Sequence, residues 1–322
     1  MPHSHHSHSG QYVSHAVDSL ETIVDHAISM NFQTFCLTEH VPRYTDDLLY
    51  PEEIAKGYTA TSLIDIFDRY YSHALQIQQR VNSDAKTRTK ILVGFECEGG
   101  ISAEYLNQSL KFRERFNPDV IVGSVHHIDG IDVDFDRETW LKAKGSKSLH
   151  DLFKRYYELQ YEMLKVVKPE VVGHFDLVRL MSLPDDDKCE LTGKLLRDVD
   201  IQLDWPDVWA LIVQNVEFIV GYGGLVEFNS AAIRKGWDTA YPKPEIVKLI
   251  LQKGGKFCLS DDSHGVQQVG LNYEKVLKYL VSIGDTLKYI HFWDLDSDGK
   301  KFVNKRTIDD LARDEFWNKY KS

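Results

Sequence analysis

Residues 90–96 read KILVGFE, an apolar and β-prone run that ends directly in the carboxylate of Glu96. The pattern recurs at residues 120–127, VIVGSVHH, where the apolar run ends in His126 and His127. Short apolar runs bounded by polar residues indicate buried strands. A side chain able to bind metal at the C-terminal end of each strand indicates a site built where parallel strands end.

Four further apolar runs end in polar side chains of the same kind. They are 32–37 before Glu39 and His40, 170–173 before His174, 224–228 before Asn229, and 256–259 before Asp262 and His264. Helical spacing appears between the runs, at residues 17–30, 63–81, 149–167, 208–220 and 245–251. Six or seven such βα units predict an α/β fold of the βα-barrel type. An open doubly wound sheet is the alternative, but it gathers ligands at one switch point, and the chain has no G-x-G-x-x-G or P-loop motif.

The first eight residues, MPHSHHSH, contain the pair His6 and His8, and His15 follows as a third candidate. Residues i and i+2 of an extended chain point the same way, so this pair can hold one metal ion. A His-rich tail or tag is the alternative. The second spaced pair, Asp262 and His264, favours a metal site. His3 and His5 are out of phase with the pair and are expected to be exposed.

Composition limits the classes of function. The 322 residues carry a net charge of -11 and are 43% hydrophobic, which is ordinary for a globular protein. The acidic balance argues against a nucleic-acid binder with a large basic face. No apolar run approaches a membrane span, and no signal peptide is recognisable. Cys36, Cys97, Cys189 and Cys258 lack C-x-x-C spacing, which predicts free thiols in a reducing cytoplasm.

A single domain over residues 1–322 is expected. Residues 129–147 and 184–206 are polar and irregular, which predicts loop insertions over the barrel mouth. Residues 288–322 are expected to form a hairpin and helix extension, because 288–305 reads as strand, Asp-Ser-Asp-Gly turn and strand.

The histidines and carboxylates at the strand ends suit zinc, iron or manganese, and a shared glutamate can bridge two ions. Other candidates have weaker signals. Packing or surface roles are expected for His26, His73, His150 and His291. Supporting roles beside the ligands are expected for Glu39, Glu98 and Asp261. His127 cannot share the ion of His126 but could face a substrate.

Seven segments together resemble the polymerase and histidinol phosphatase (PHP) superfamily, and within it the monofunctional histidinol-phosphate phosphatases of the fungal type. They are HHSHSG (5–10), LTEHVPR (37–43), VGFECE (93–98), IVGSVHHID (121–129), VVGHFDLVR (171–179), VEFNSAAIRK (226–235) and LSDDSH (259–264). The resemblance implies a distorted (β/α)₇ barrel with three divalent ions, zinc in the first place and manganese or iron as alternatives. Many members of the superfamily carry Asp where this chain has Ser4.

The resemblance also implies a ligand set for each ion. The first would be held by His6, His8, Glu96 and Asp262, the second by Glu96, His126 and His174, and the third by His15, His40 and His264. Glu96, Asp262 and His264 would be the catalytic residues.

The implied activity is hydrolysis of L-histidinol phosphate to L-histidinol and phosphate by a metal-bridging hydroxide. The candidate substrate-binding residues are Arg179, Arg234, Arg43, Asn229 and His127. The arginines could bind the phosphate through bidentate hydrogen bonds. A phosphodiesterase or nuclease on the same metal centre is the first alternative, and a non-enzymatic metal buffer is the second. The first should show a basic groove. The sequence leaves the oligomeric state open.

Overall fold

Seven strands of the computed structural model, which describes residues 2–320, pair in parallel and in chain order. They are β1 (His3–Ser4), β2 (Thr34–Leu37), β3 (Lys90–Gly99), β4 (Val120–Val125), β7 (Val171–Val172), β8 (Leu225–Asn229) and β9 (Lys256–Ser260). The first and last strands meet, because the His5 N–H donates to the Leu259 carbonyl at 3.2 Å and Ser7 bridges to Ser263 in parallel. The sheet is therefore a nearly closed barrel, which confirms the predicted fold class.

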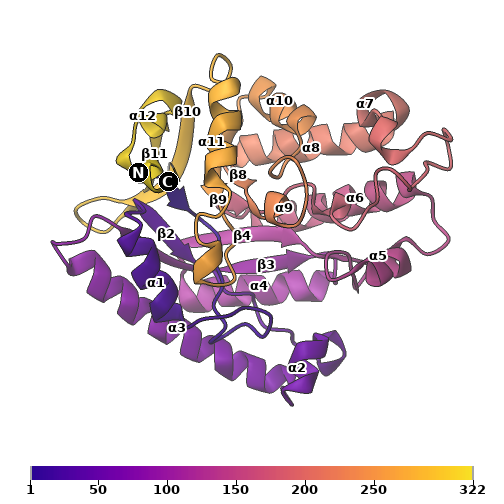
Figure 1. Cartoon of the computed structure of the whole chain (residues 1–322). Coiled ribbons are helices and arrows are strands. Elements are labelled where there is room, and N and C mark those ends of the chain that lie inside the picture. The colour runs from indigo at the N-terminus through magenta and orange to yellow at the C-terminus, as the bar shows by residue number, and fades with distance from the viewer. Residues whose placement is uncertain (1, 321–322) are drawn as a thin grey trace.

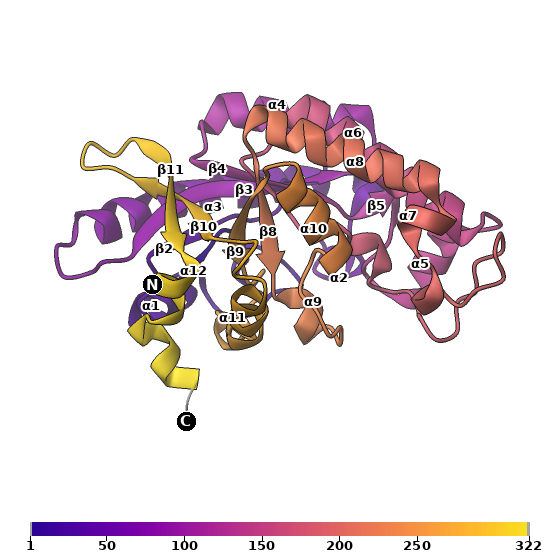
Figure 2. The same ribbon diagram turned by 90° about the horizontal axis from the view of Figure 1, so that it is seen from above.

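Helices cover the outside of the sheet (Figure 1, Figure 2). The helices of the described residues are α1 (Leu20–Ser29), α2 (Pro51–Ala55), α3 (Ala60–Ser83), α4 (Ala103–Phe116), α5 (Arg137–Lys144), α6 (Leu149–Val167), α7 (Ile201–Asp204), α8 (Pro206–Tyr222), α9 (Ala231–Arg234), α10 (Pro244–Gln252), α11 (Tyr273–Ser282) and α12 (Ile308–Ala312). All five predicted helices are present. The predicted helical stretches do not include α2, α4, α9 or α11, although Ser102 caps α4 by accepting the Tyr105 N–H.

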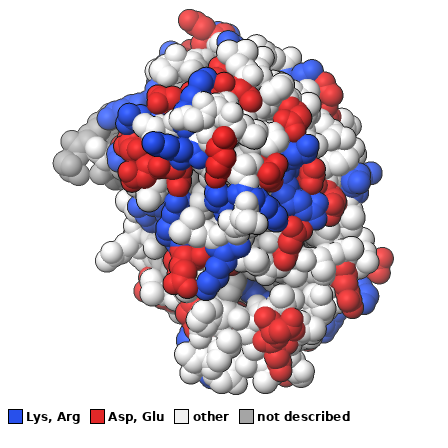
Figure 3. Space-filling view, turned by 90° about the vertical axis from the view of Figure 1, so that its right-hand side faces the viewer, with Lys and Arg blue, Asp and Glu red and all other residues white. Residues whose placement is uncertain are grey.

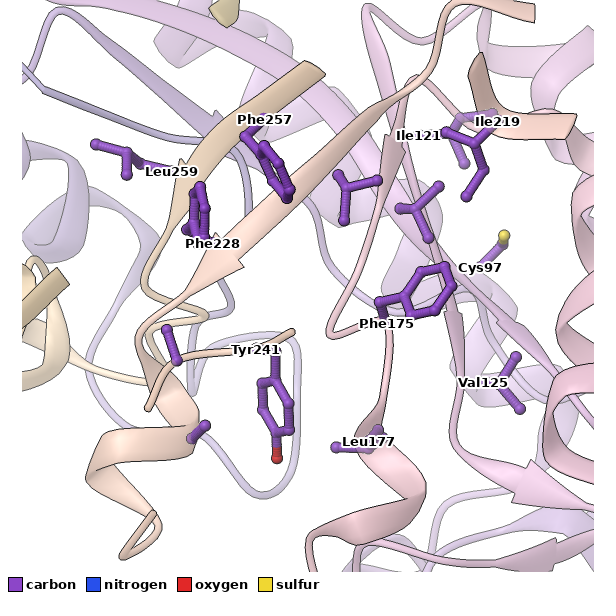
Figure 4. Close-up of a cluster of buried hydrophobic side chains, with 14 of the residues drawn as sticks. Cys97, Ile121, Val125, Phe175, Leu177, Ile219, Phe228, Tyr241, Phe257 and Leu259 are labelled. Carbon is purple, nitrogen blue, oxygen red and sulfur yellow. The ribbon is translucent and has the colours of Figure 1, made fainter. Parts of the chain in front are cut away.

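Alternation along the strands gives the barrel two different surfaces. On β3, Phe95 and Cys97 belong to the large core between sheet and helices, whereas Leu92 belongs to a separate small cluster. Figure 4 shows part of the large core, in which Phe228 of β8 stacks on Phe257 of β9 with ring centroids 4.3 Å apart. The small cluster takes residues from six barrel strands, β2, β3, β4, β7, β8 and β9: Cys36, Leu92, Val120, Val122, Val171, Leu225 and Cys258. It is the apolar lining of the barrel's interior.

The C-terminal hairpin of β10 (Tyr289–Leu295) and β11 (Lys301–Thr307) packs on this apolar lining through Trp293 and Leu295. The hairpin explains why the expectation for His3 and His5 is wrong, since both side chains are buried. The Trp293 N–H donates to His5 Nε2 at 2.9 Å, and the Leu259 N–H donates to His3 Nε2 at 2.8 Å. These two histidines fasten the N-terminal segment to β10 and β9.

The segment 129–147 is more regular than expected. It contains the turn and the second strand of a short hairpin of β5 (His127–Ile128) and β6 (Ile131–Asp132), and α5 follows. Asp136 caps α5 by accepting the Thr139 N–H at 2.7 Å. The segment 184–206 holds mainly turns and the single-turn α7. All four cysteines are free and buried, as predicted, and no helix in the described residues is long and apolar enough to cross a membrane.

Candidate metal centre

Glu96 is the residue on which the site converges. It lies near the C-terminal end of β3 and is 1% exposed. Its Oε2 lies 3.1 Å from His6 Nε2, 3.4 Å from His8 Nε2 and 3.0 Å from His40 Nδ1. Its Oε1 lies 3.4 Å from His126 Nε2 and 3.3 Å from His174 Nε2. Five histidines from four segments of the chain thus surround one carboxylate.

Asp262 supplies a second carboxylate beside the histidine pair. Its Oδ1 lies 3.6 Å from both His6 Nε2 and His8 Nε2 and 3.7 Å from His264 Nδ1. Asp262 has a positive φ of 50°, a conformation that Asp tolerates better than most residues. The chain turns sharply here as it leaves β9.

The possible ligand atoms form four overlapping groups, each within 4.8 Å. These groups are His6, His8 and Asp262; His6, Glu96 and His174; His40, Glu96 and His126; and His8, His40 and His264. His15 lies beside the last group, with its ring centroid 5.3 Å from that of His40 and 5.1 Å from that of His264. All nine predicted ligand residues are therefore brought together, from residue 6 to residue 264.

The chemistry of the cluster fits metal ions. The Nε2 atoms of His6 and His8 and both oxygens of Glu96 are buried without a hydrogen-bond partner, a costly state that a bound cation would relieve. Burial lowers the pKa of His126 to about 3, so this imidazole is neutral and able to ligate. Burial alone would raise the pKa of Glu96, but the surrounding imidazoles, His6 first, hold it well below its ordinary value. Burial lowers the pKa of His6, but Glu96, Asp262 and Glu227 outweigh it and raise the pKa overall, so a metal ion that binds this ring would displace its proton. Neutral imidazole with carboxylate is then a donor set for zinc and its neighbours.

Carboxylates behind the histidines fix the direction of the rings. Glu227 Oε2 lies 3.4 Å from His6 Nδ1, and its Oε1 accepts the His174 N–H at 2.6 Å. Glu39 Oε2 lies 3.5 Å from His8 Nδ1. In both histidines Nε2 is thereby left facing Glu96, the arrangement found around ligating histidines.

Glu227 is not among the residues predicted from the sequence, because it lies within a run, 224–228, that is otherwise apolar or glycine. The alternation of β8 was the available signal, since Glu227 shares a face with Asn229. Asn229 Nδ2 donates to Glu227 Oε1 at 2.7 Å. Asn229 therefore orients a supporting carboxylate, and it does not line the cavity over the histidines.

A cavity of about 310 Å³ opens over the cluster. Besides predicted ligands it is lined by residues that the sequence reading did not single out: Tyr50, Glu52, Asp132, Asp134, Phe135, Lys235 and Gln268. Arg234 also lines it, and its guanidinium donates to the carbonyls of Asp261 and Asp262 at 3.1 Å each. Arg234 thus braces the turn that carries Asp262.

The structure does not bring the other two arginines into this cavity. Arg179 is buried, pairs with Asp176 at 2.9 Å through Nε and donates to the Ala240 carbonyl at 3.1 Å. Arg43 lies 3.6 Å from Glu98 and has its guanidinium 3.8 Å from the centre of the Tyr50 ring. Both guanidinium groups are therefore paired with carboxylates of the protein itself.

His127 and Glu98 form the layer behind the cavity wall. The His127 ring is parallel to that of Tyr50, with centroids 6.3 Å apart, and is not part of the lining. Glu98 Oε1 lies 2.9 Å from His40 Nδ1. Burial would raise the pKa of Glu98, but Arg43 and His40 hold it well below its ordinary value.

Comparison with known proteins agrees with this geometry. The barrel with its cluster of histidines and carboxylates defines a candidate metal-dependent βα-barrel protein. The PHP domain family matches residues 4–231, and the chain belongs to that family.

The chain is 39% identical to the histidinol-phosphatase of Saccharomyces cerevisiae, over 98% of this chain and 99% of that protein. It is 37% identical to a probable histidinol-phosphatase of Schizosaccharomyces pombe, over 99% and 97% of the two chains. A solved structure of histidinol phosphate phosphatase from Lactococcus lactis, complexed with zinc, L-histidinol and phosphate, has the same fold. Its TM-score is 0.61 at 16% identity, covering 88% of this chain and 93% of that one.

Proposed function

We propose that this chain is a metal-dependent histidinol-phosphatase, a phosphomonoesterase that converts L-histidinol phosphate and water to L-histidinol and phosphate. The activity would serve histidine biosynthesis. The 39% identity to the budding-yeast histidinol-phosphatase over 98% of the chain carries the proposal. The cluster of histidines and carboxylates at the barrel mouth supports it independently. A cytoplasmic location, which the four free and buried cysteines favour, is part of the same proposal.

Three divalent ions are proposed, with zinc first because the lactococcal structure contains it. His6, His8, Glu96 and Asp262 would hold one ion, Glu96, His126 and His174 a second, and His15, His40 and His264 a third. The short distances from both oxygens of Glu96 to histidines on opposite sides support its place between the ions. Manganese or iron would suit the same donors.

When bound, such ions activate water and offset charge on phosphate oxygens. The chain's own residues prepare the site for this chemistry. Glu227 and Glu39 keep His6 and His8 turned toward Glu96. The backbone carbonyl of Asp262 lies 2.9 Å from His264 Nδ1 and leaves Nε2 of that ring available. Arg234 and Lys235 give one wall of the cavity a positive charge that suits a phosphate ester.

The phosphodiesterase alternative would need a basic track for a nucleic-acid backbone. Figure 3 shows basic side chains interspersed with acidic ones on the side of the molecule that carries α5 and α7 in Figure 1. The cavity wall itself carries Glu52, Asp132 and Asp134 beside the two cations. These features favour a small zwitterionic ester over a polyanion.

Phosphate release tests the proposal. Purified protein loaded with Zn²⁺ or Mn²⁺ is given L-histidinol phosphate, p-nitrophenyl phosphate and a thymidine phosphodiester in parallel. We expect kcat/KM to be highest for L-histidinol phosphate. Preferential cleavage of the diester, or equal cleavage of both monoesters, would contradict the proposed substrate while leaving the metal barrel in place.

A further inference from the structure

One wall of the cavity carries carboxylates that are not among the proposed metal ligands. It is formed by Asp132 and Asp134, which follow β4 through the β5–β6 hairpin. The Val133 N–H donates to the His126 carbonyl at 2.9 Å, which ties this segment to the strand end that carries His126. The two carboxylates are thus held at a set place beside the metal centre.

The local backbone fixes Asp132 further. Its Oδ1 accepts the N–H groups of Asp134 and Phe135 at 2.8 and 2.7 Å. Asp132 forms no ion pair with Lys or Arg in the part of the chain that the structure describes. Asp134 has one weak ion-pair partner, Lys235, at 3.9 Å. Asp132 therefore lacks a cation, and Asp134 has only a distant one.

The electrostatics of the wall point to a positively charged ligand. Burial and the neighbouring Asp134 raise the pKa of Asp132 to about 7, and burial also raises the pKa of Asp134. A cation placed between them would offset both effects, since an opposite charge favours the ionised carboxylate. Phe135, which is 46% exposed, and Tyr50 lie on the lining of the same cavity. They offer apolar ring surface beside the acidic pair.

We propose that Asp132 and Asp134 form the subsite for the ammonium group of the substrate, and that they select phosphate esters of amino alcohols. The inference rests on the proposed function, in which the ester group lies over the metal centre. L-Histidinol phosphate carries its ammonium on the carbon next to the one that bears the ester oxygen. The carboxylates beside the metal centre would take the ammonium, while Phe135 and Tyr50 would contact the imidazole ring. The acidic wall then makes the amine a condition for tight binding.

The test compares esters that differ only in the amine. kcat/KM is measured for L-histidinol phosphate and for 3-(imidazol-4-yl)propyl phosphate, which lacks it. Asp134→Asn should lower kcat/KM about 10- to 100-fold for the first ester, the range for loss of one charge-assisted hydrogen bond. For the second ester, the same substitution should change kcat/KM less than about threefold. Asp132→Asn should act in the same direction, because an Asn Oδ1 still accepts the two turn N–H groups.

Glu138→Gln is the matched control, since it removes one carboxylate from α5 whose side chain is 77% exposed. This control should leave kcat/KM unchanged for both esters. If Asp134→Asn lowers kcat/KM equally for both esters, or for neither, the proposed ammonium subsite is wrong.

A second pair of esters separates failure of this inference from failure of the proposed function. Wild-type protein is also given O-phosphoethanolamine and propyl phosphate. L-Histidinol phosphate could prove a poor substrate while O-phosphoethanolamine is preferred over propyl phosphate. If Asp134→Asn then removes that preference, the subsite is supported and the proposed substrate is wrong. If wild-type protein cleaves L-histidinol phosphate and its desamino analogue equally well, the proposed function stands and the subsite falls.

Discussion

Single residues at the strand ends have three different roles: they supply carboxylates, orient histidine rings and join chain segments. Glu96 and Asp262 present carboxylate oxygens to the histidine cluster. Glu227 and Glu39 face the far side of His6 and His8 and set their ring orientation. Ser4 donates its hydroxyl to Asp261 Oδ1 at 2.9 Å. The two chain segments that carry His6 and Asp262 are thereby joined.

Removing one proposed ligand should reduce metal binding without unfolding the barrel. Asp262→Ala and His264→Ala are each expected to lose bound metal. Each should also lose more activity than the roughly 10- to 100-fold that a supporting residue costs. Metal per chain is measured by mass spectrometry alongside circular dichroism and phosphate release. Asp285→Ala, at a fully exposed carboxylate outside the cavity, is the control. Full metal content and activity in both site variants would refute the assignment.

Glu227→Gln tests orientation separately from ligation. The Gln keeps an oxygen that can accept the His174 N–H but removes the carboxylate from His6 Nδ1. We expect metal affinity to fall roughly 10- to 100-fold, with activity restored at high metal concentration. Competition with a chelator of known affinity measures the change. Unchanged affinity would mean that Glu227 serves packing alone.

At the scale of elements, the C-terminal hairpin seals the end of the barrel opposite the metal centre. Trp293 and Leu295 cover the apolar lining, and the backbone of Trp293 binds His5. His291 lies on the same strand, with its Nδ1 buried and unpaired. Burial lowers the pKa of His291 to about 4, and Lys256 and Lys305 add to the effect.

The free energy of unfolding should fall in mild acid because of His291, which lies on this hairpin. A histidine with a depressed pKa binds fewer protons folded than unfolded, so its contribution is intact above about pH 6.5 and falls as the pH drops toward 4. By pH 5.5 the loss should be about 1 kcal/mol, after allowance for partial exposure. His291→Phe keeps a ring and removes the titration. The fall in unfolding free energy between pH 7.5 and 5.5, measured by urea denaturation, should be smaller in this variant by that amount.

His150→Phe gives a control of opposite sign. Burial lowers the pKa of His150, but Asp207 and Asp151 outweigh it and raise the pKa overall. Its contribution is therefore present at low pH and lost as the pH rises. Removing it should steepen the loss of stability in acid. Identical pH profiles for wild type and both variants would contradict these assignments.

For the molecule as a whole, metal binding and folding should be linked. The cluster draws its side chains from residues 6 to 264, so a complete site exists only when the barrel is closed. A ligand at 100 times its dissociation constant that binds only the folded state stabilises it by about 2.7 kcal/mol. Chelation should lower the midpoint of thermal unfolding by several degrees, and Zn²⁺ or Mn²⁺ should restore it. Calorimetry checks this, and an unchanged midpoint would argue against a site that spans the barrel.

Local pattern in the sequence predicted six of the seven barrel strands and candidate metal ligands at or near their ends. The reason is physical: period-two alternation and a polar residue at each strand end are local properties, and parallel strands bring those ends to one edge. The grouping of nine residues around metal ions came from the resemblance to the PHP superfamily. The roles of Arg179, Arg43, His3 and Glu227 depended on tertiary structure. Arg179 could face a phosphate or Asp176, and only packing places Asp176 beside it. His3 is buried because a hairpin nearly 290 residues later covers it. Which charges are already paired, and which face an open cavity, is set by contacts between segments far apart in the chain.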